Sequence, residues 1–241
     1  MSESAGKQGE VDRFKGLLEG IVQSSKRIML AYALSIIAIA LIAFLALIGM
    51  AAAGVAAVVS TGDLGLPGPQ GPSPTLLIPV IIIIALLLII PSYIMFSGAR
   101  VLKSAVEGAG DHPIARELDL PVKIMYLSAL GILVGLATLI ILVGIIILMV
   151  ASLGWAIGAL LYGLALRKID PALSTGGTLI VVGVVLQLLA LIPINVLGLL
   201  GLIGFLLELI GFYVVYSDAG KLLGRLGQEG SPGYTAPASE A

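Results

Sequence analysis

The chain has 241 residues, of which 59% are hydrophobic and 11% are charged, whereas a typical soluble domain carries about 25% charged residues. So few charges cannot cover a water-soluble globule, and we expect lipid to surround most of the chain. The formal net charge of −1 argues against a nucleic-acid-binding surface, and the lack of cysteine excludes disulfides and thiolate metal sites.

The first predicted element is a cytosolic amphipathic segment, residues 1–27. Its apolar residues Val11, Phe14, Leu18 and Ile21 recur at helical spacing among charged ones. A short helix lying on the membrane surface and a helix packed on the end of a bundle both fit this pattern. A cleaved signal peptide does not, because mixed charges and no short basic leader precede the first long apolar run.

Two membrane spans follow, over about 28–60 and 75–98. A span needs about 20 apolar residues, so the first is longer than a bilayer requires, and its Ala-rich end can project beyond the hydrocarbon or let the helix tilt. The isoleucine block Ile81–Ile84 favours a strand in water, but in lipid the backbone must bond internally, which favours a helix. Between the spans, residues 61–75 are rich in Pro and Gly and predict an irregular connector.

The uncharged region from Ile124 to Leu166 is about twice as long as one span needs. We interpret it as a tight hairpin with spans over 124–150 and 152–166, which turns near the small residues Ala151 to Gly154. This interpretation places Trp155 at the membrane interface, where indole rings are common. If the region instead crosses once, the chain has five spans.

The last two predicted spans cover about 178–192 and 196–217, with Pro193 and Asn195 at the turn between them. Residues 221–241 then form a flexible cytosolic tail. The fold class is therefore all-α, a polytopic membrane bundle of about six transmembrane helices within residues 28–220.

Six spans bring both termini to the same side of the membrane. All 13 Lys and Arg residues then fall on that side, while the opposite side holds only Asp63. By the positive-inside rule both termini are cytoplasmic, and the chain is a multi-pass protein of the cell membrane.

Glu208 is the one ionisable residue deep in a predicted span. Its side chain is too short to reach either interface, and no Lys or Arg lies in any span to neutralise it. An isolated buried carboxylate costs several kcal/mol, so we expect Glu208 to be protonated or hydrogen-bonded. It is either a proton or cation site in a translocation path, or a structural strut between helices.

The surroundings of Glu208 predict a helix-packing face. Gly201, Gly204 and Gly211 share one side of the helix with Glu208, and small residues let another helix approach closely. Gln187 is the other strongly polar side chain deep in a span, and together with Glu208 it forms the candidate intramembrane polar site. Further candidate partners of Glu208 are Ser35, Ser128, Thr138 and Tyr162.

Signatures of catalysis and of cofactor binding are missing from the sequence. No phosphate-binding glycine loop, zincin helix or nucleophile elbow occurs, so we predict no enzyme activity, no catalytic residue, no metal ligand and no cofactor. The single histidine, His112, precedes Pro113 at a predicted helix start and is expected to be solvated. Residues 93–99 and 213–219 are similar, which suggests an internal duplication of the kind found in transporters.

The last predicted hairpin is similar in sequence to a group of known membrane proteins. The stretches GGTLIVVGVVLQLLALIP and GLLGLIGFLLELIGFYVVYS, about a sixth of the chain, resemble small archaeal multi-pass membrane proteins of unknown function. The resemblance implies an archaeal source and a membrane location, and it implies no activity.

Two functions are compatible with these features. The first is a non-enzymatic helix-packing or assembly component of a membrane complex or homo-oligomer, whose partners are the bilayer and other membrane helices. The alternative is a proton- or ion-coupled transporter that uses Glu208.

Overall fold

The computed structural model describes residues 2–61, 74–139, 142–191 and 197–229. These residues form six α-helices and no strands: α1 (Ser2–Thr61), α2 (Pro74–Ala109), α3 (Pro113–Ala137), α4 (Leu142–Ile169), α5 (Pro171–Ala190) and α6 (Leu197–Glu229). Each contains a stretch long and apolar enough to cross a membrane. The fold class predicted from the sequence, a polytopic helical membrane bundle, is therefore confirmed, and the five-span alternative is not supported.

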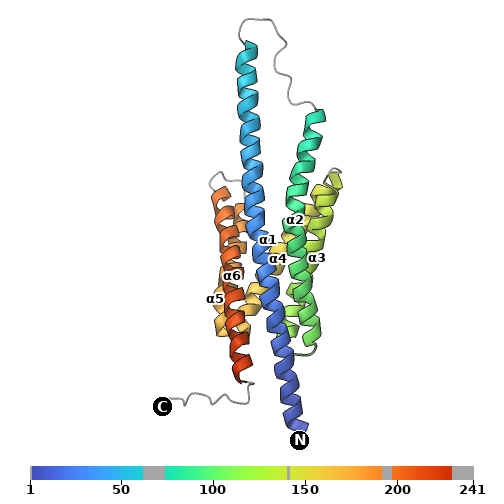
Figure 1. Ribbon diagram of the computed structural model, residues 1–241, viewed down its shortest axis with the longest axis vertical. Helices are drawn as coiled ribbons and strands as arrows, with labels where there is room; N and C mark the ends of the chain where they lie inside the picture. Colours follow the sequence, from blue (N-terminus) through green and yellow to red (C-terminus); the bar gives the residue numbers. More distant parts are fainter. Residues whose placement is uncertain (1, 62–73, 140–141, 192–196, 230–241) are drawn as a thin grey trace.

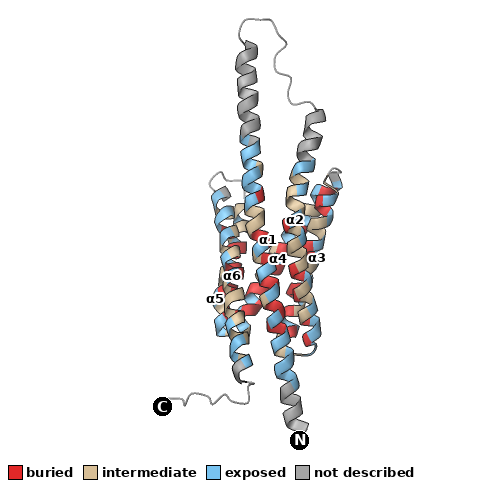
Figure 2. Ribbon diagram, in the orientation of Figure 1, coloured by how far each residue is buried: buried red, intermediate tan, exposed pale blue. Residues whose placement is uncertain are grey.

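The helices run alternately up and down, and each contacts the next in the chain while α6 returns to contact α1. The result is a closed ring of six helices. Figure 1 shows α1 and α2 extending above the other four, with the start of α1 and the end of α6 at the bottom. Buried residues concentrate where all six helices overlap, and exposed residues cover the outside (Figure 2). The outside is largely apolar, as contact with lipid requires.

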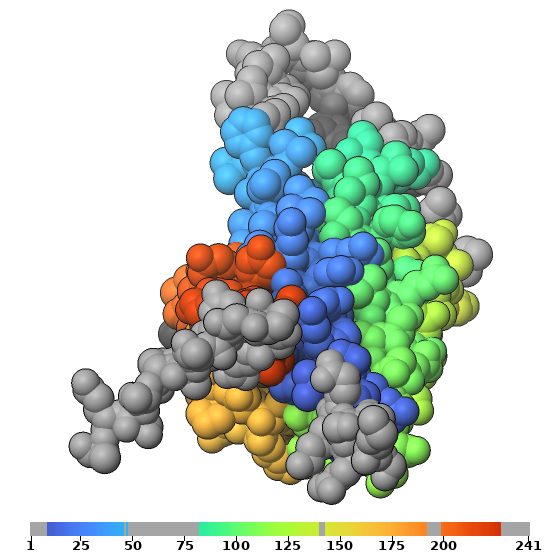
Figure 3. Space-filling model, turned by 60° about the horizontal axis from the view of Figure 1, so that its bottom comes forward, coloured from blue at the N-terminus to red at the C-terminus, as the bar shows by residue number. Residues whose placement is uncertain are grey.

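The N-terminal segment is continuous with the first span, in one helix of 60 residues. Leu18, Ile21, Ser25, Ile28 and Tyr32 are spaced alternately by 3 and 4 residues, and all are buried. Such spacing is typical of a helix that packs along one seam. The segment therefore packs on the bundle, where α1 lies between α6 and the α2–α3 pair (Figure 3), and a separate helix on the membrane surface is not observed.

The hairpin between the third and fourth helices turns earlier than the sequence predicted. The helix α3 ends at Ala137, and residues 151–154 lie inside α4, so the predicted spans 124–150 and 152–166 are wrong. Thr138 is the C-cap of α3, where its hydroxyl donates to the Val134 carbonyl (2.8 Å). The small residues that suggested a turn instead serve packing: Ala151 meets Gly131, and Gly154 meets Ser128.

Other helices extend beyond their predicted spans: α2 ends at Ala109 where the span was predicted to end at 98, and α5 begins at Pro171 where it was predicted to begin at 178. The helix α6 continues to Glu229, and Leu222, Leu223 and Leu226 pack on the core, so the predicted tail from 221 is helical at its start. Between α2 and α3 only Gly110 to His112 separate the helices; Gly110 adopts a positive φ of 58°. Residues 62–73 of the predicted connector 61–75 lie outside the described residues, as does the predicted turn at Pro193 and Asn195.

Candidate intramembrane polar site

The interior of the ring contains a chain of hydrogen bonds across three helices. Trp155 on α4 donates from Nε1 to the hydroxyl of Tyr32 on α1 (3.0 Å), and Tyr32 donates to Oε2 of Glu208 on α6. All three side chains are buried, with Glu208 only 1% exposed. Because α1 and α4 are not neighbours in the ring, this chain connects opposite sides of the bundle.

Gln187 on α5 lies near Glu208, because a Cβ atom on Gly204, one helical turn before Glu208, would lie 3.0 Å from Cγ of Gln187. Its Nε2 is buried, and neither this atom nor Oε1 of Glu208 has a hydrogen-bond partner among the described residues. The structure thus brings together both residues of the candidate polar site. Of the other candidates, Thr138 bonds within its own helix and Ser128 packs against Gly154, so neither is seen to bond Glu208.

Close contact between α5 and α6 brings Gln187 beside Glu208. A Cβ atom on Gly183 would lie 2.6 Å from the Gly204 carbonyl oxygen, and one on Gly204 would lie 2.5 Å from that of Gly183. Neither distance leaves room for a side chain, so both positions need glycine at this separation. Gly211 meets Ile180 in the same way, two turns further along α6. A Cβ atom on Gly201 would lie 3.1 Å from Cβ of Ala190.

Aromatic rings fill the space around the carboxyl group. The Tyr32 ring lies against Phe205 (centroids 4.6 Å apart) and Phe212 (5.9 Å), and Phe212 stacks on Tyr162 (6.2 Å). Glu208 lines none of the four cavities described in the structure, whereas Gln187 lines one of them, between α4 and α5. Glu208 therefore links α6 to α1 through a hydrogen bond made within a cluster of aromatic rings.

Sequence reasoning missed Tyr32 and Trp155. Tyr32 was overlooked because a span starting at Ile28 places it near the interface, far from the middle of the last span. The sequence signal that would have placed Tyr32 deeper in the bundle is the helical spacing of Leu18, Ile21, Ile28 and Tyr32, which are all buried in the structure. Trp155 was expected at the membrane interface, but it is 7% exposed and belongs to the core, a consequence of the misplaced turn.

His112 lies between α2 and α3 and has a structural role there. It precedes α3 as its N-cap, where Nδ1 accepts a hydrogen bond from the Ile114 backbone N–H (3.4 Å), and its ring stacks on Phe14 of α1 at 5.7 Å. The described residues contain no group of three or more His, Cys, Asp or Glu side chains that could hold a metal ion.

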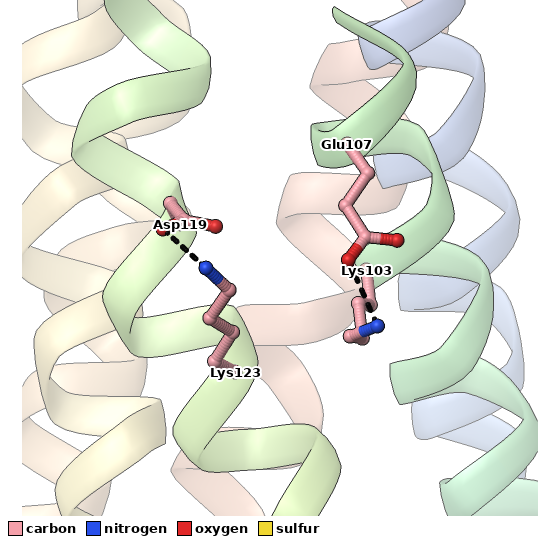
Figure 4. A network of polar contacts seen from close by, with 4 residues as sticks. All are labelled: Lys103, Glu107, Asp119 and Lys123. Atoms are coloured by element: carbon pink, nitrogen blue, oxygen red, sulfur yellow. Dashed lines mark hydrogen bonds and ion pairs between the residues drawn. The ribbon is translucent and has the colours of Figure 1, made fainter. Parts of the chain in front are cut away.

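Near the connection between α2 and α3, two lysines each form an ion pair with an acidic residue of the same helix, one on α2 and one on the neighbouring α3 (Figure 4). On α2, Lys103 pairs with Glu107, and on α3, Lys123 pairs with Asp119, both at 2.8 Å. The hydrogen bond to Glu107 raises the pKa of Lys103 above its ordinary value, and Nζ of Lys103 lies 5.2 Å from the centre of the Tyr126 ring. These exposed pairs contribute little to stability, because water screens them.

No protein-family model, curated protein or solved structure was found to match this chain.

Proposed function

We propose that this integral membrane protein is a non-enzymatic helix-packing component that assembles into a membrane complex or homo-oligomer. One observation carries the proposal: Glu208, the ionisable residue predicted to lie deepest in the membrane, is bonded to Tyr32 inside a ring packed with aromatic side chains. A carboxyl used in this way stabilises the fold. The outer faces of the helices are then the surfaces through which the protein can contact other membrane proteins.

The length of α1 supports an assembly role. From Ile28 to Thr61 the helix carries no charged residue, and at about 1.5 Å per residue this stretch is roughly 50 Å long. The hydrocarbon core of a bilayer is about 30 Å thick. Contact with a second membrane protein, or with another copy of this chain, would cover the uncharged helix that exceeds the bilayer.

The oligomeric state tests this proposal. Membranes are extracted in mild detergent and the protein is transferred to lipid nanodiscs for single-molecule photobleaching, with a parallel native gel of the initial extract. We expect a complex larger than the 24.7 kDa chain in at least one of the two measurements. A strict monomer in both the extract and the nanodiscs would contradict the assembly role.

A second candidate function is a proton- or ion-coupled carrier. The observation in its favour is that Oε1 of Glu208 and Nε2 of Gln187 lack hydrogen-bond partners among the described residues. Gln187 also lines a cavity of about 460 Å³ bounded by α4 and α5. Ionisable side chains inside membrane bundles often mark ion or proton pathways.

Reconstituted vesicles distinguish the two candidates. A carrier that uses Glu208 dissipates an imposed pH or ion gradient, and Glu208→Gln abolishes this flux because the amide cannot exchange a proton. The assembly proposal predicts no flux above that of protein-free vesicles for either protein. Flux that Glu208→Gln removes would establish the carrier and displace the assembly proposal.

A further inference from the structure

A groove of about 770 Å³ opens at the cytosolic ends of α3, α4 and the start of α5. It is the largest of the four cavities described and does not touch the Glu208 site. Its volume lies within the range of small-molecule sites, about 300–1,000 Å³. Neither the packing of the bundle nor the assembly role accounts for it.

The lining of the groove changes from charged to apolar along the helices. Arg116 on α3 and Arg167 and Lys168 on α4 line it at the cytosolic end. One to two helical turns further toward the membrane, the lining is formed by Leu120 and by Leu161 and Leu164. Leu120 is 62% exposed, so this apolar side is open to lipid. The lining thus matches a molecule with a charged end in the cytosolic interface and an apolar end in the hydrocarbon.

The charges of the groove favour an anion. Among the described residues, no acidic side chain lies within ion-pair distance of Arg167 or Lys168, unlike Lys103, Lys123 and Lys221, which are paired. Arg116 pairs with Asp111 (3.0 Å), which lies outside the lining, and Glu117 is the one acidic residue of the lining. The nearby Asp170 is engaged as the N-cap of α5, where it accepts from the Ala172 N–H (2.7 Å).

The beginning of α5 adds hydrogen-bonding capacity to the same place. Ser174, in the first turns of this helix, lines the groove and offers a hydroxyl donor. The partial positive charge of a helix N-terminus also favours an anion nearby. Basic pockets between membrane helices on the cytoplasmic side are known to suit phosphate headgroups.

We propose that this groove binds an anionic phospholipid of the cytosolic leaflet. Arg167, Lys168 and Arg116 contact the headgroup phosphate, and an acyl chain lies along Leu120 and Leu164. Arg167 and Lys168 are both exposed, so their charged groups are accessible to a headgroup.

Native mass spectrometry tests the proposal by counting lipids that remain bound. The protein in neutral detergent is titrated with phosphatidylglycerol or phosphatidylcholine of the same acyl chains. We expect one phosphatidylglycerol to bind with preference over phosphatidylcholine. The double variant Arg167→Gln/Lys168→Gln should weaken this binding roughly tenfold or more, since each basic residue near a headgroup contributes about 1 kcal/mol.

Two matched variants sharpen the experiment. Lys103→Gln/Lys123→Gln removes the same charge from the same end of the bundle but outside the groove, and it should leave the preference unchanged. Glu117→Gln removes the opposing carboxylate and should strengthen binding. Equal losses in both double variants would overturn the proposal, because they would show only a general attraction to the basic end.

A competition experiment with inorganic phosphate distinguishes a lipid headgroup from a soluble anion as the ligand of the groove. If inorganic phosphate at millimolar concentration displaces the lipid, the groove is a site for a soluble anion, and the lipid assignment is wrong. Retention of phosphatidylglycerol under these conditions supports the lipid assignment, because the acyl chain contributes to binding.

Discussion

At the residue scale, side chains from four helices meet at the Glu208 carboxyl of α6. Tyr32 of α1 donates to one of its oxygens, Trp155 of α4 donates to the Tyr32 hydroxyl, and Gln187 of α5 lies nearby. A buried polar group that loses its partner costs about 1–3 kcal/mol. The stability of the bundle should therefore depend on the hydrogen-bonding capacity of residue 208 and much less on its charge.

Substitution of Glu208 separates these two properties. Glu208→Gln keeps the size and an oxygen acceptor for Tyr32, so we expect a change of less than about 1 kcal/mol in unfolding free energy. Glu208→Ala leaves Tyr32 without its acceptor and opens a cavity, which should cost about 2–4 kcal/mol. Thermal or denaturant unfolding in detergent micelles measures both.

The exposed Glu19 provides the control, since Glu19→Ala on the surface of α1 should change stability by less than about 0.5 kcal/mol. If Glu208→Gln proved as damaging as Glu208→Ala, the negative charge itself would matter and the structural interpretation would be wrong.

At the element scale, the interface of α5 and α6 depends on glycine. The sequence predicted a glycine face around Glu208 from helical spacing alone, because that spacing is a local property of one helix. It could not identify α5 as the helix opposite, or Gly183 as the counterpart of Gly204, because the register between two helices is set by the whole bundle.

Gly204→Ala should destabilise the bundle by about 1–3 kcal/mol, because the added methyl group meets the backbone of α5 and backbone atoms cannot move aside cheaply. Gly224→Ala on the same helix meets nothing within 4 Å and should stabilise α6 by about 0.5–1 kcal/mol. Unfolding curves of the two variants should shift in opposite directions. Similar shifts would show that α5 and α6 are further apart than described.

The start of α1 is a second element where sequence and structure differ. The amphipathic pattern was visible, but a helix on a membrane and a helix on a bundle bury the same face, so local sequence could not distinguish them. Leu18 is fully buried, whereas Val11 is 44% exposed.

This difference gives a test of the packed arrangement. Leu18→Ala should cost about 2–5 kcal/mol of stability even in detergent without lipid, and Val11→Ala should cost much less. Hydrogen exchange in detergent should likewise show slow amides around Leu18. Rapid exchange there, with no loss of stability in Leu18→Ala, would favour a helix held only by the membrane surface.

At the scale of the whole molecule, the number of helices followed from composition, because each span must be long and uncharged. The error in the 124–166 region arose because small residues mark both turns and close helix contacts, and an uncharged run contains no other boundary signal. The closed ring and its packed interior depend on contacts between distant segments such as Tyr32 and Glu208, which no local pattern encodes.

The central claim is that Glu208 lies in an interior closed to water. The chain has no cysteine, so single cysteines can be introduced without background. Glu208→Cys and the exposed Gly224→Cys are treated in membranes with a thiosulfonate reagent that reacts only in water, and the folded fraction of each is checked by gel filtration. We expect rapid labelling at position 224 and none at position 208 under the same conditions. Labelling of folded Glu208→Cys at a comparable rate would show that water reaches this interior, which contradicts the claim.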